Sequence, residues 1–445
     1  MKIFPDTFIQ KMQKLLPNEA DAFFNSQQTI PPISLRLHPL KSTLHLFEEA
    51  TKVDWCNLGR YLNERPVFTY DPHFHAGAYY VQEAGSMLLE QLLLPFFEEN
   101  KNLVVLDLCA APGGKSTHLL SMMNDEGILV SNELIPTRNK ILRQNIAKWG
   151  FPNCVVTQNK AEDFSKSKIQ FDVIVVDAPC SGEGLFRKDE HAITEWSIDQ
   201  VNVCSSRQTQ ILDAILPSLK PGGLLLYSTC TYEESENDLQ IERLIQEYGM
   251  QVRTPSPPQG IKSTKHGWQA FPHLVKSEGF YCCLLQKNGE RKENNFSIQK
   301  NNSKKSNTPD LSSWTTMDHL FNYSTQQDFI YANTKGVQEI TQQLSSSCYI
   351  RTSGILMGEI KGKDFIPSAE LSLSNSIHPE VPFVQLNLDE AIQYLCGDPI
   401  QSDSDKTGWH LVKYEHSILG WAKKIASRWN NYYPKEWRIQ NKPKK

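Results

Sequence analysis

Three segments of this 445-residue chain contain residues whose types and spacing suit chemistry. A loop of small residues, CAAPGGKST at 109–117, follows a hydrophobic run that ends at Asp107. Two further hydrophobic runs lead into DAPCSGEG at 177–184 and STCTY at 228–232. The carboxyl ends of parallel strands meet at one edge of a sheet, where ligands bind. We therefore expect Asp177, Cys180 and Cys230 to lie together beside the small-residue loop.

Three classes of cofactor are candidates for the loop that begins at Cys109, and each requires a different sequence pattern. A phosphate-binding loop needs GxxxxGK[ST]; Gly114 and Lys115 fit this pattern, but Cys109 stands where the first glycine belongs. A dinucleotide site needs GxGxxG, which Ala111 and Pro112 break. S-adenosylmethionine needs a close backbone turn but no cradle for a pyrophosphate, and the loop favours this cofactor. An ordinary tight turn between a strand and a helix is the alternative without a ligand. Glu133 ends the next predicted strand, where a carboxylate can accept both ribose hydroxyls.

Two thiols beside a methyl donor indicate a methyl acceptor that is not itself nucleophilic. C5 of cytosine is such an atom, and attack of a thiolate on C6 makes it reactive. The C5 proton must then leave, which requires a general base. Asp177 is suited to hold the amino edge of the ring in the attack geometry. These residues alone leave open whether Cys180 or Cys230 is the nucleophile.

The elements that must position these residues alternate between strand-length hydrophobic runs and helical patterns, which is typical of an α/β fold with a parallel sheet. One helix is predicted from Pro136 to just before Gly150. We expect a small α+β N-terminal domain at 1–75, a catalytic domain at 76–288 and an α+β C-terminal region at 309–445. Residues 289–308, rich in Asn, Lys and Ser, are predicted to form a linker. The predicted strands span 103–108, 128–134, 154–159, 171–177, 223–229 and 280–287.

Composition and charge exclude some classes of protein and leave others open. No apolar run approaches the roughly 20 residues that cross a bilayer, so we expect a cytoplasmic protein without a membrane partner. The sequence contains no pair of CxxC motifs at the spacing of a zinc finger, so it predicts no metal site. The net charge is −4, yet residues 409–445 carry nine basic and two acidic residues and four of the nine tryptophans. This basic and aromatic segment predicts an RNA-binding module. A tryptophan core with a solvated tail is the alternative.

Together, DLCAAPGGKSTHLL, DAPCSGEGLFRKD and STCTYEESEND resemble, in order and spacing, the Sun/nucleolar-type RNA 5-methylcytosine methyltransferases over residues 75–287. The segment GWHLVKYEHSILGWAKKIASRWNNYYPKEWR looks like the PUA-like module of that family's bacterial ribosomal RNA branch, the methyltransferase F type, and ISLRLHPLK is similar to its N-terminal segment. The resemblance implies a Rossmann-like S-adenosylmethionine-dependent methyltransferase domain. It also implies that the N-terminal domain at 1–75 binds RNA and that the substrate is rRNA, with 16S rRNA expected either as free RNA or within a small-subunit particle. Nothing in the sequence demands a dimer, so we expect a monomer. A tRNA substrate and a non-catalytic RNA-binding assembly factor are the alternatives.

The resemblance also implies roles for individual residues. Cys230 corresponds to the family nucleophile and Cys180 to the cysteine that promotes product release, with Asp177 beside them. Many members have Asp where this chain has Asn159, so the charge of that adenine contact is lost. The implied cofactor contacts are Cys109, Ala110, Ala111, Pro112, Gly113, Gly114, Lys115, Glu133, Asn159 and Asp177.

Three weaker signals flank these motifs. Arg187 and Lys188 either hold the phosphate beside the target base or form a solvated charge pair. Tyr80, Gln82 and Glu83 either line the cofactor pocket or belong to a helix entry. His273 has no partner in the sequence and is assigned no catalytic role.

Overall fold

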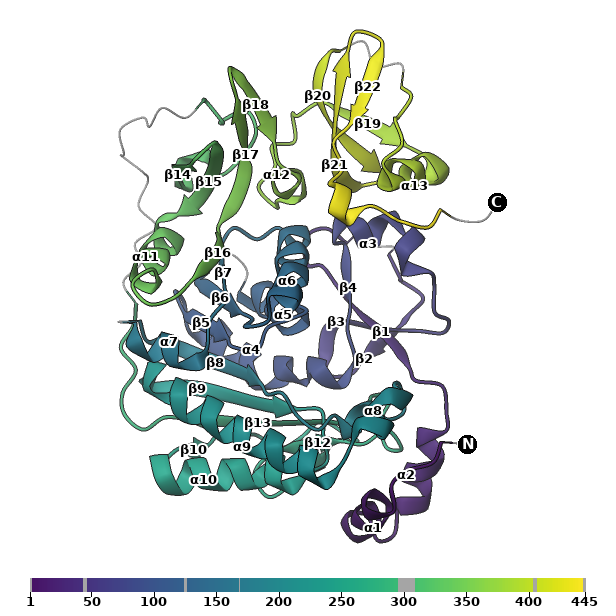
Figure 1. The fold of residues 1–445 in the computed structure, drawn as a ribbon, viewed down its shortest axis with the longest axis vertical. Coiled ribbons are helices and arrows are strands. Elements are labelled where there is room, and N and C mark those ends of the chain that lie inside the picture. Colours follow the sequence, from purple (N-terminus) through teal and green to yellow (C-terminus); the bar gives the residue numbers. More distant parts are fainter. Residues whose placement is uncertain are drawn as a thin grey trace.

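The predicted strands form the centre of a ten-stranded sheet in the computed structural model, which describes residues 2–42, 46–123, 126–167, 169–294, 309–402 and 406–442 (Figure 1). The order is β11-β12-β13-β9-β8-β5-β6-β7-β16, and β10 pairs with β13. The strands from β9 to β7 run parallel, which confirms the α/β prediction. The strands are β5 (Val104–Asp107), β6 (Ile128–Asn132), β7 (Cys154–Thr157), β8 (Phe171–Asp177), β9 (Leu219–Thr229), β10 (Gln251–Val252), β11 (Lys262–Ser263), β12 (Trp268–Ala270), β13 (Phe280–Gln286) and β16 (Ile350–Ser353).

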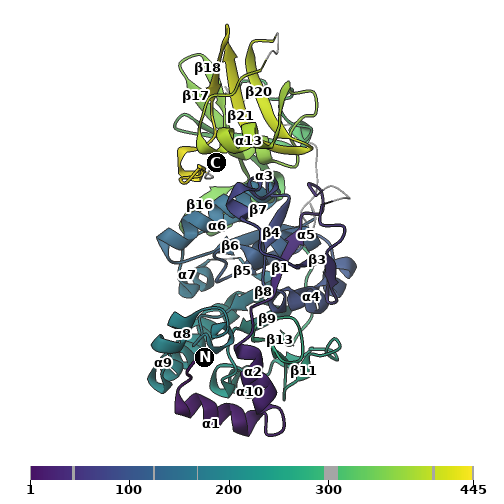
Figure 2. The same cartoon turned by 90° about the vertical axis from the view of Figure 1, so that its right-hand side faces the viewer.

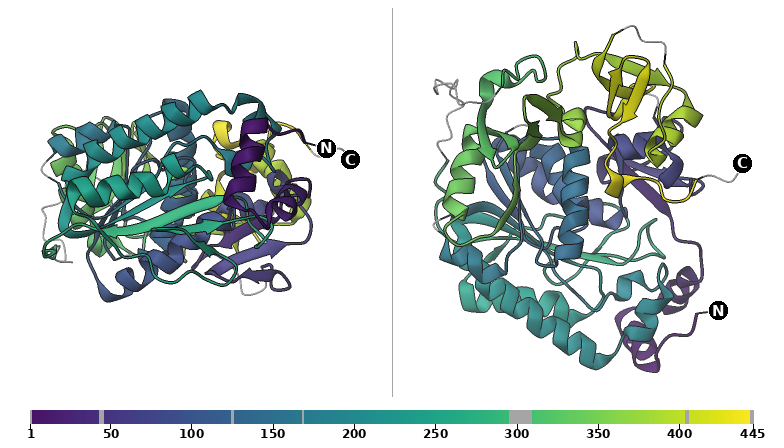
Figure 3. Two further views of the ribbon diagram at one scale, coloured as in Figure 1. Left: turned by 90° about the horizontal axis from the view of Figure 1, so that it is seen from below. Right: turned by 45° about the horizontal axis from the view of Figure 1, so that its top comes forward.

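Helices cover both faces of this sheet, as Figure 3 shows. Successive side chains of a strand point to opposite faces. Val105 of β5 therefore packs in one core with α4 (Leu89–Glu99), α5 (Gly114–Met123) and α6 (Pro136–Trp149). Val104 and Leu106 pack in the other core with α7 (Ala161–Lys166), α9 (Ile198–Ile215) and α10 (Asp238–Tyr248). Burial on both faces explains why these strands are continuous hydrophobic runs.

The N-terminal region has two parts that lie apart (Figure 2). One part is a sheet of β1 (Ile33–Leu37), β2 (Thr51–Val53), β3 (Cys56–Leu62) and β4 (Tyr79–Val81). Helix α3 (Pro72–Ala76) lies between β3 and β4 in the chain. This sheet extends to Val81, beyond the boundary predicted at residue 75. Helices α1 (Asp6–Leu15) and α2 (Ala20–Gln27) instead pack on the catalytic domain, where Phe8 and Phe23 share a core with Phe186 and Tyr232.

The C-terminal region forms two more sheets and also contributes to the central one. Helix α11 (Lys335–Leu344) packs Val337, Ile340 and Leu344 into the catalytic core, and β16 pairs antiparallel with β7. The predicted separation of 309–445 from the catalytic domain is therefore wrong for this segment, because it completes the central sheet. One further sheet contains β14 (Phe321–Gln326), β15 (Phe329–Thr334), β17 (Ile355–Lys361) and β18 (Asp364–Pro367). The other contains β19 (Phe383–Leu386), β20 (Gly408–Tyr414), β21 (Ser417–Ile425) and β22 (Arg428–Asn431), accompanied by α12 (Ala369–Leu373) and α13 (Leu388–Cys396).

The start of the predicted linker is bound to the catalytic domain, and the tryptophans of the C-terminal module differ in burial. Of the predicted linker, residues 295–308 lie outside the described residues, whereas Arg291 and Asn294 bond to the buried Asp172. Trp421 and Trp429 are core residues of the C-terminal module, as the alternative interpretation proposed. Trp409 and Trp437 are partly exposed. None of the described helices combines the length and apolar character that crossing a membrane requires.

Lys41 joins the three regions at one point. Its ammonium donates to the carbonyl oxygens of Ala76, Lys148 and Leu373, which come from the N-terminal region, α6 and α12. Replacing Lys41 by methionine leaves these carbonyls without their donor, so we expect the free energy of unfolding to fall by about 1–3 kcal/mol. Denaturant titration measures this, with the exposed Lys52→Met as the charge-matched control. Equal losses in both variants would contradict the assigned role.

Candidate active site

The two predicted cysteines meet at the carboxyl edge of the central sheet. Cys180 follows β8 and Cys230 follows β9, and these strands pair in parallel with Asp177 opposite Ser228. The two Sγ atoms are 3.0 Å apart, and the backbone N–H of Cys230 donates to Cys180 Sγ at 3.3 Å. Both residues are free thiols and partly exposed. The structure thus brings the two motifs together at an edge that a substrate can reach.

The pKa of the Cys180 thiol is raised by the hydrogen bond to Cys230, and burial and the nearby Glu236 raise it further. A raised pKa favours the protonated form of Cys180. A thiolate, not a thiol, is the nucleophilic form of cysteine. The raised pKa therefore disfavours Cys180 as the attacking sulfur.

Two buried carboxylates hold the cysteine loops in place. Glu236 accepts hydrogen bonds from the backbone N–H of Ser181 at 3.0 Å and from Gln208 Nε2 at 2.8 Å. Glu183 accepts from Thr231 Oγ1 and from the backbone N–H of Tyr232, both at 3.1 Å. Burial raises the pKa of Glu183 to about 7. Neither carboxylate was predicted from the sequence, although both lie inside the quoted motifs, where an acidic residue among small ones is the available signal.

Asp177 connects the cysteines to the small-residue loop. Its Oδ2 lies 2.8 Å from Lys115 Nζ, and its Oδ1 accepts from Ser228 Oγ at 2.8 Å. A carboxylate offers about four acceptor sites, so these two bonds orient the group and leave capacity for a ligand. The side chain is about one-third exposed, at 37%. Lys115 is buried and fixes the loop to the end of β8.

The loop itself has the shape of a cofactor-binding turn. Gly113 has φ +118°, a conformation that side chains rarely adopt. Helix α6 holds the loop from behind, because Arg138 donates to the carbonyl of Ala111 and Asn145 to that of Pro112, each at 2.8 Å. The preceding Cys109 and Ala110 continue the chain from β5, and Gly114 begins α5.

The residues at the other strand ends fit S-adenosylmethionine. Asp107 Oδ1 is buried without a hydrogen-bond partner among the described residues, and burial raises the pKa of this carboxyl to about 7. This atom, the glycine turn and the carboxylate of Glu133 match the polar groups of the methionine and ribose moieties. Glu133 is oriented by the backbone N–H of Ile135 at 2.8 Å. These residues would hold the cofactor.

Asn159 follows β7 and joins it to a distant segment of the chain. Its Oδ1 accepts from the backbone N–H of Tyr349 at 2.7 Å, and its Nδ2 donates to the carbonyl of Tyr349 at 3.2 Å. One lone pair of Oδ1 and one N–H of Nδ2 are thus used to join β7 to the segment before β16. The second lone pair and the second N–H leave capacity for the predicted adenine contact, which stays a prediction.

The flanking residues have structural partners. Arg187 is buried and forms a double hydrogen bond with Glu278, with contacts of 2.9–3.1 Å, so it is not free to hold a phosphate. Glu83 accepts from the backbone N–H groups of Gly85 and Ser86, which confirms the helix-entry interpretation. His273 pairs with Glu19 at 2.8 Å.

A parallel sheet with a glycine turn after its first strand and acidic groups at the neighbouring strand ends defines an S-adenosylmethionine-dependent methyltransferase. Solved structures share this fold. The crystal structure of PH0851 superposes with a TM-score of 0.59 at 24% identity over 64% of this chain and 66% of that one. NSun6 from Pyrococcus horikoshii with SFG gives 0.56 at 19% identity over 65% and 100%.

Sequence comparison gives the family. Family models match as 16S rRNA methyltransferase RsmB/F (residues 93–286), the N-terminal domain of 16S rRNA methyltransferase RsmF (4–84) and the methyltransferase RsmF PUA domain (381–439). Ribosomal RNA small subunit methyltransferase F of Vibrio vulnificus strain YJ016 is 29% identical over 97% of both chains. The protein of that name from Shewanella loihica is 31% identical over 81% of this chain and 77% of its own. The chain belongs to the ribosomal RNA small subunit methyltransferase F family.

Proposed function

We propose that this protein methylates C5 of a cytosine in 16S rRNA. The observation that carries the proposal is the pair of cysteine sulfurs 3.0 Å apart beside Asp177. Methylation of an amine or a hydroxyl needs no covalent catalysis, whereas C5 of cytosine becomes nucleophilic only after a thiolate has added to C6. The names of the matching family models and relatives support 16S rRNA as the substrate.

The side chains have separate roles in this proposal. Cys230 Sγ adds to C6, and the electron pair of the C5–C6 double bond then bonds C5 to the methyl group. S-adenosylmethionine, when bound, supplies that methyl group as an electrophile. Asp177 accepts a hydrogen bond from the amino edge and orients the ring. A general base takes the C5 proton, its electron pair restores the C5–C6 double bond, and Cys230 leaves C6 with the electron pair of the broken S–C bond. We assign Cys180 to this release step, in which its thiol can give a proton to the departing Cys230 sulfur 3.0 Å away.

The substrate contacts of the C-terminal module are part of the proposal. Lys413 Nζ lies 4.1 Å from the ring centre of Phe383, and Lys423 Nζ lies 5.1 Å from that of Trp409. Phe383 is exposed and Trp409 partly so. Cations beside accessible rings suit phosphate contacts and base stacking. We assign this surface of β19 to β21 to RNA binding.

The product nucleoside tests the proposed activity. We expect purified protein to transfer labelled methyl groups to unmethylated 16S rRNA or small-subunit particles, and digestion to yield labelled 5-methylcytidine. Bisulfite sequencing then identifies the modified nucleotide. Unmodified tRNA is the control substrate. Label in another nucleoside would disprove methylation at C5 of cytosine. Label in tRNA alone would show that tRNA, and not 16S rRNA, is the substrate. Absence of any transfer would favour the non-catalytic alternative.

A further inference from the structure

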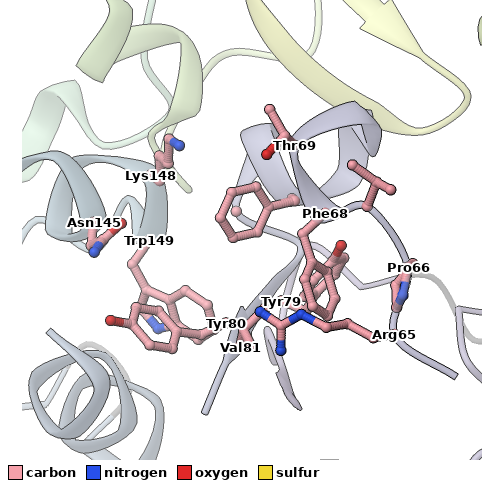
Figure 4. A pocket seen from close by; sticks show the side chains of 13 residues that line it. Arg65, Pro66, Phe68, Thr69, Tyr79, Tyr80, Val81, Asn145, Lys148 and Trp149 are labelled. Atoms are coloured by element: carbon pink, nitrogen blue, oxygen red, sulfur yellow. The ribbon is translucent and has the colours of Figure 1, made fainter. Parts of the chain in front are cut away.

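A cavity separate from the active site lies between the N-terminal sheet and α6 (Figure 4). Its volume is about 550 Å³, within the range of roughly 300–1,000 Å³ typical of small-ligand sites. Neither cysteine lines it, nor does any other residue of the predicted site. The side chains that define it are the rings of Phe68, Phe74, Tyr80 and Trp149 and the cations of Arg65 and Lys148.

Lys148 is the unusual member of this lining. The residue is 7% exposed, no hydrogen bond or ion pair of Nζ occurs among the described residues, and Nζ is not one of their fully buried atoms. Instead, the ammonium lies 5.1 Å from the ring centre of Phe74 and 5.9 Å from that of Trp437 in the C-terminal module. Burial lowers the pKa of Lys148 to about 8. The ammonium is thus a cation without an ion pair that is open to the cavity and largely surrounded by apolar rings, and a ligand that supplies an acceptor is favoured here.

The walls of the cavity are fixed by backbone contacts. Gly77 ends α3 with φ +73°, and a Cβ atom there would lie 2.3 Å from the carbonyl oxygen of Lys148. Helices α3 and α6 are therefore in direct backbone contact. The ring of Tyr80 lines the cavity and also reaches the cofactor loop, since a Cβ atom added at Gly114 would lie 3.4 Å from it. The cavity is thus preformed beside the methyltransferase site.

We propose that this pocket binds one unpaired nucleotide of the RNA substrate other than the target cytosine. The base stacks on the rings of Phe74 and Tyr80, and Lys148 donates to an oxygen of the base or its phosphate. Arg65 is exposed at the rim, with its guanidinium 5.5 Å from the ring centre of Phe68, and meets the adjoining phosphate. Proximity to Trp437 places the pocket between the C-terminal module and the active site. The inference rests on the proposed RNA substrate.

The kinetic test compares two lysines of α6. We expect Lys148→Met to raise KM for RNA about tenfold, the loss of one charge-assisted hydrogen bond, with kcat and the affinity for S-adenosylmethionine unchanged. Lys140→Met, an exposed charge-matched control on the same helix, should leave KM within about twofold. Equal changes of KM in the two variants would contradict the proposed binding of a nucleotide in the pocket.

A cross-linking test uses the wild-type protein and needs no methyl transfer. Single-stranded 16S rRNA fragments carrying 5-iodouridine at single positions are irradiated on the protein, and the linked peptides are mapped. We expect a cross-link to Phe74 or Tyr80 from a nucleotide that is not the methylated one. Absence of pocket cross-links at every position, or cross-links only from the target position, would overturn the proposal. Failure of wild-type protein to methylate any RNA would count against the proposed function alone.

Discussion

Cys230→Ser is expected to lower the rate of methyl transfer by about 10⁴-fold or more and to abolish the covalent RNA adduct, because a serine hydroxyl is a poor substitute for a thiolate. Single-turnover assays with labelled S-adenosylmethionine measure the rate. Denaturing gels detect the adduct as a protein band that carries RNA. The fold should be unaffected, because Cys230 is partly exposed and its Sγ contacts only Cys180 among the described hydrogen bonds.

The matching variant Cys180→Ser is expected to accumulate that adduct. Cys230 remains able to attack C6, but the group beside it that we assign to product release is lost. Cys396→Ser, a partly exposed cysteine of α13, is the control and should behave as wild type. An adduct that persists in Cys230→Ser and is missing in Cys180→Ser would reverse the two roles.

The sequence predicts this site well because its parts are local to strand ends. Asp107, Asp177 and Cys230 each follow a continuous hydrophobic run, and a parallel sheet places all such ends at one edge. The continuous hydrophobic run of β5 likewise follows from burial on both faces. No long-range information is needed for either inference.

The contacts that escaped prediction join segments far apart in the chain. Asn159 and Tyr349 are 190 residues apart, and Arg187 and Glu278 are 91 apart. A side-chain amide that pairs with a distant backbone, or a guanidinium that pairs with a distant carboxylate, leaves no periodic pattern in a single sequence. The same reason applies to β16, a short strand whose partially buried residues show no clear alternation.

The role of β16 and α11 leads to the second large effect. Deleting residues 309–445 is expected to destabilise the methyltransferase domain and not only to remove an RNA-binding module. Val337, Ile340 and Leu344 are each at most 2% exposed in its core, and burying such a side chain contributes about 1.5–3 kcal/mol. Their summed loss is comparable to the whole stability of a typical domain, about 5–15 kcal/mol.

A shorter deletion of residues 378–445 separates the two roles, because it keeps α11 and β16 while removing β19 to β22. We expect this variant to bind S-adenosylmethionine as the full chain does, in calorimetry, but to bind RNA more weakly and with a smaller dependence on salt, since phosphate contacts are lost. The longer deletion should lose cofactor binding and unfold at a lower temperature. Cofactor affinity and melting temperature equal to those of the full chain after the longer deletion would show that the catalytic sheet is complete without β16, and that its pairing with β7 is a docking contact between independent domains.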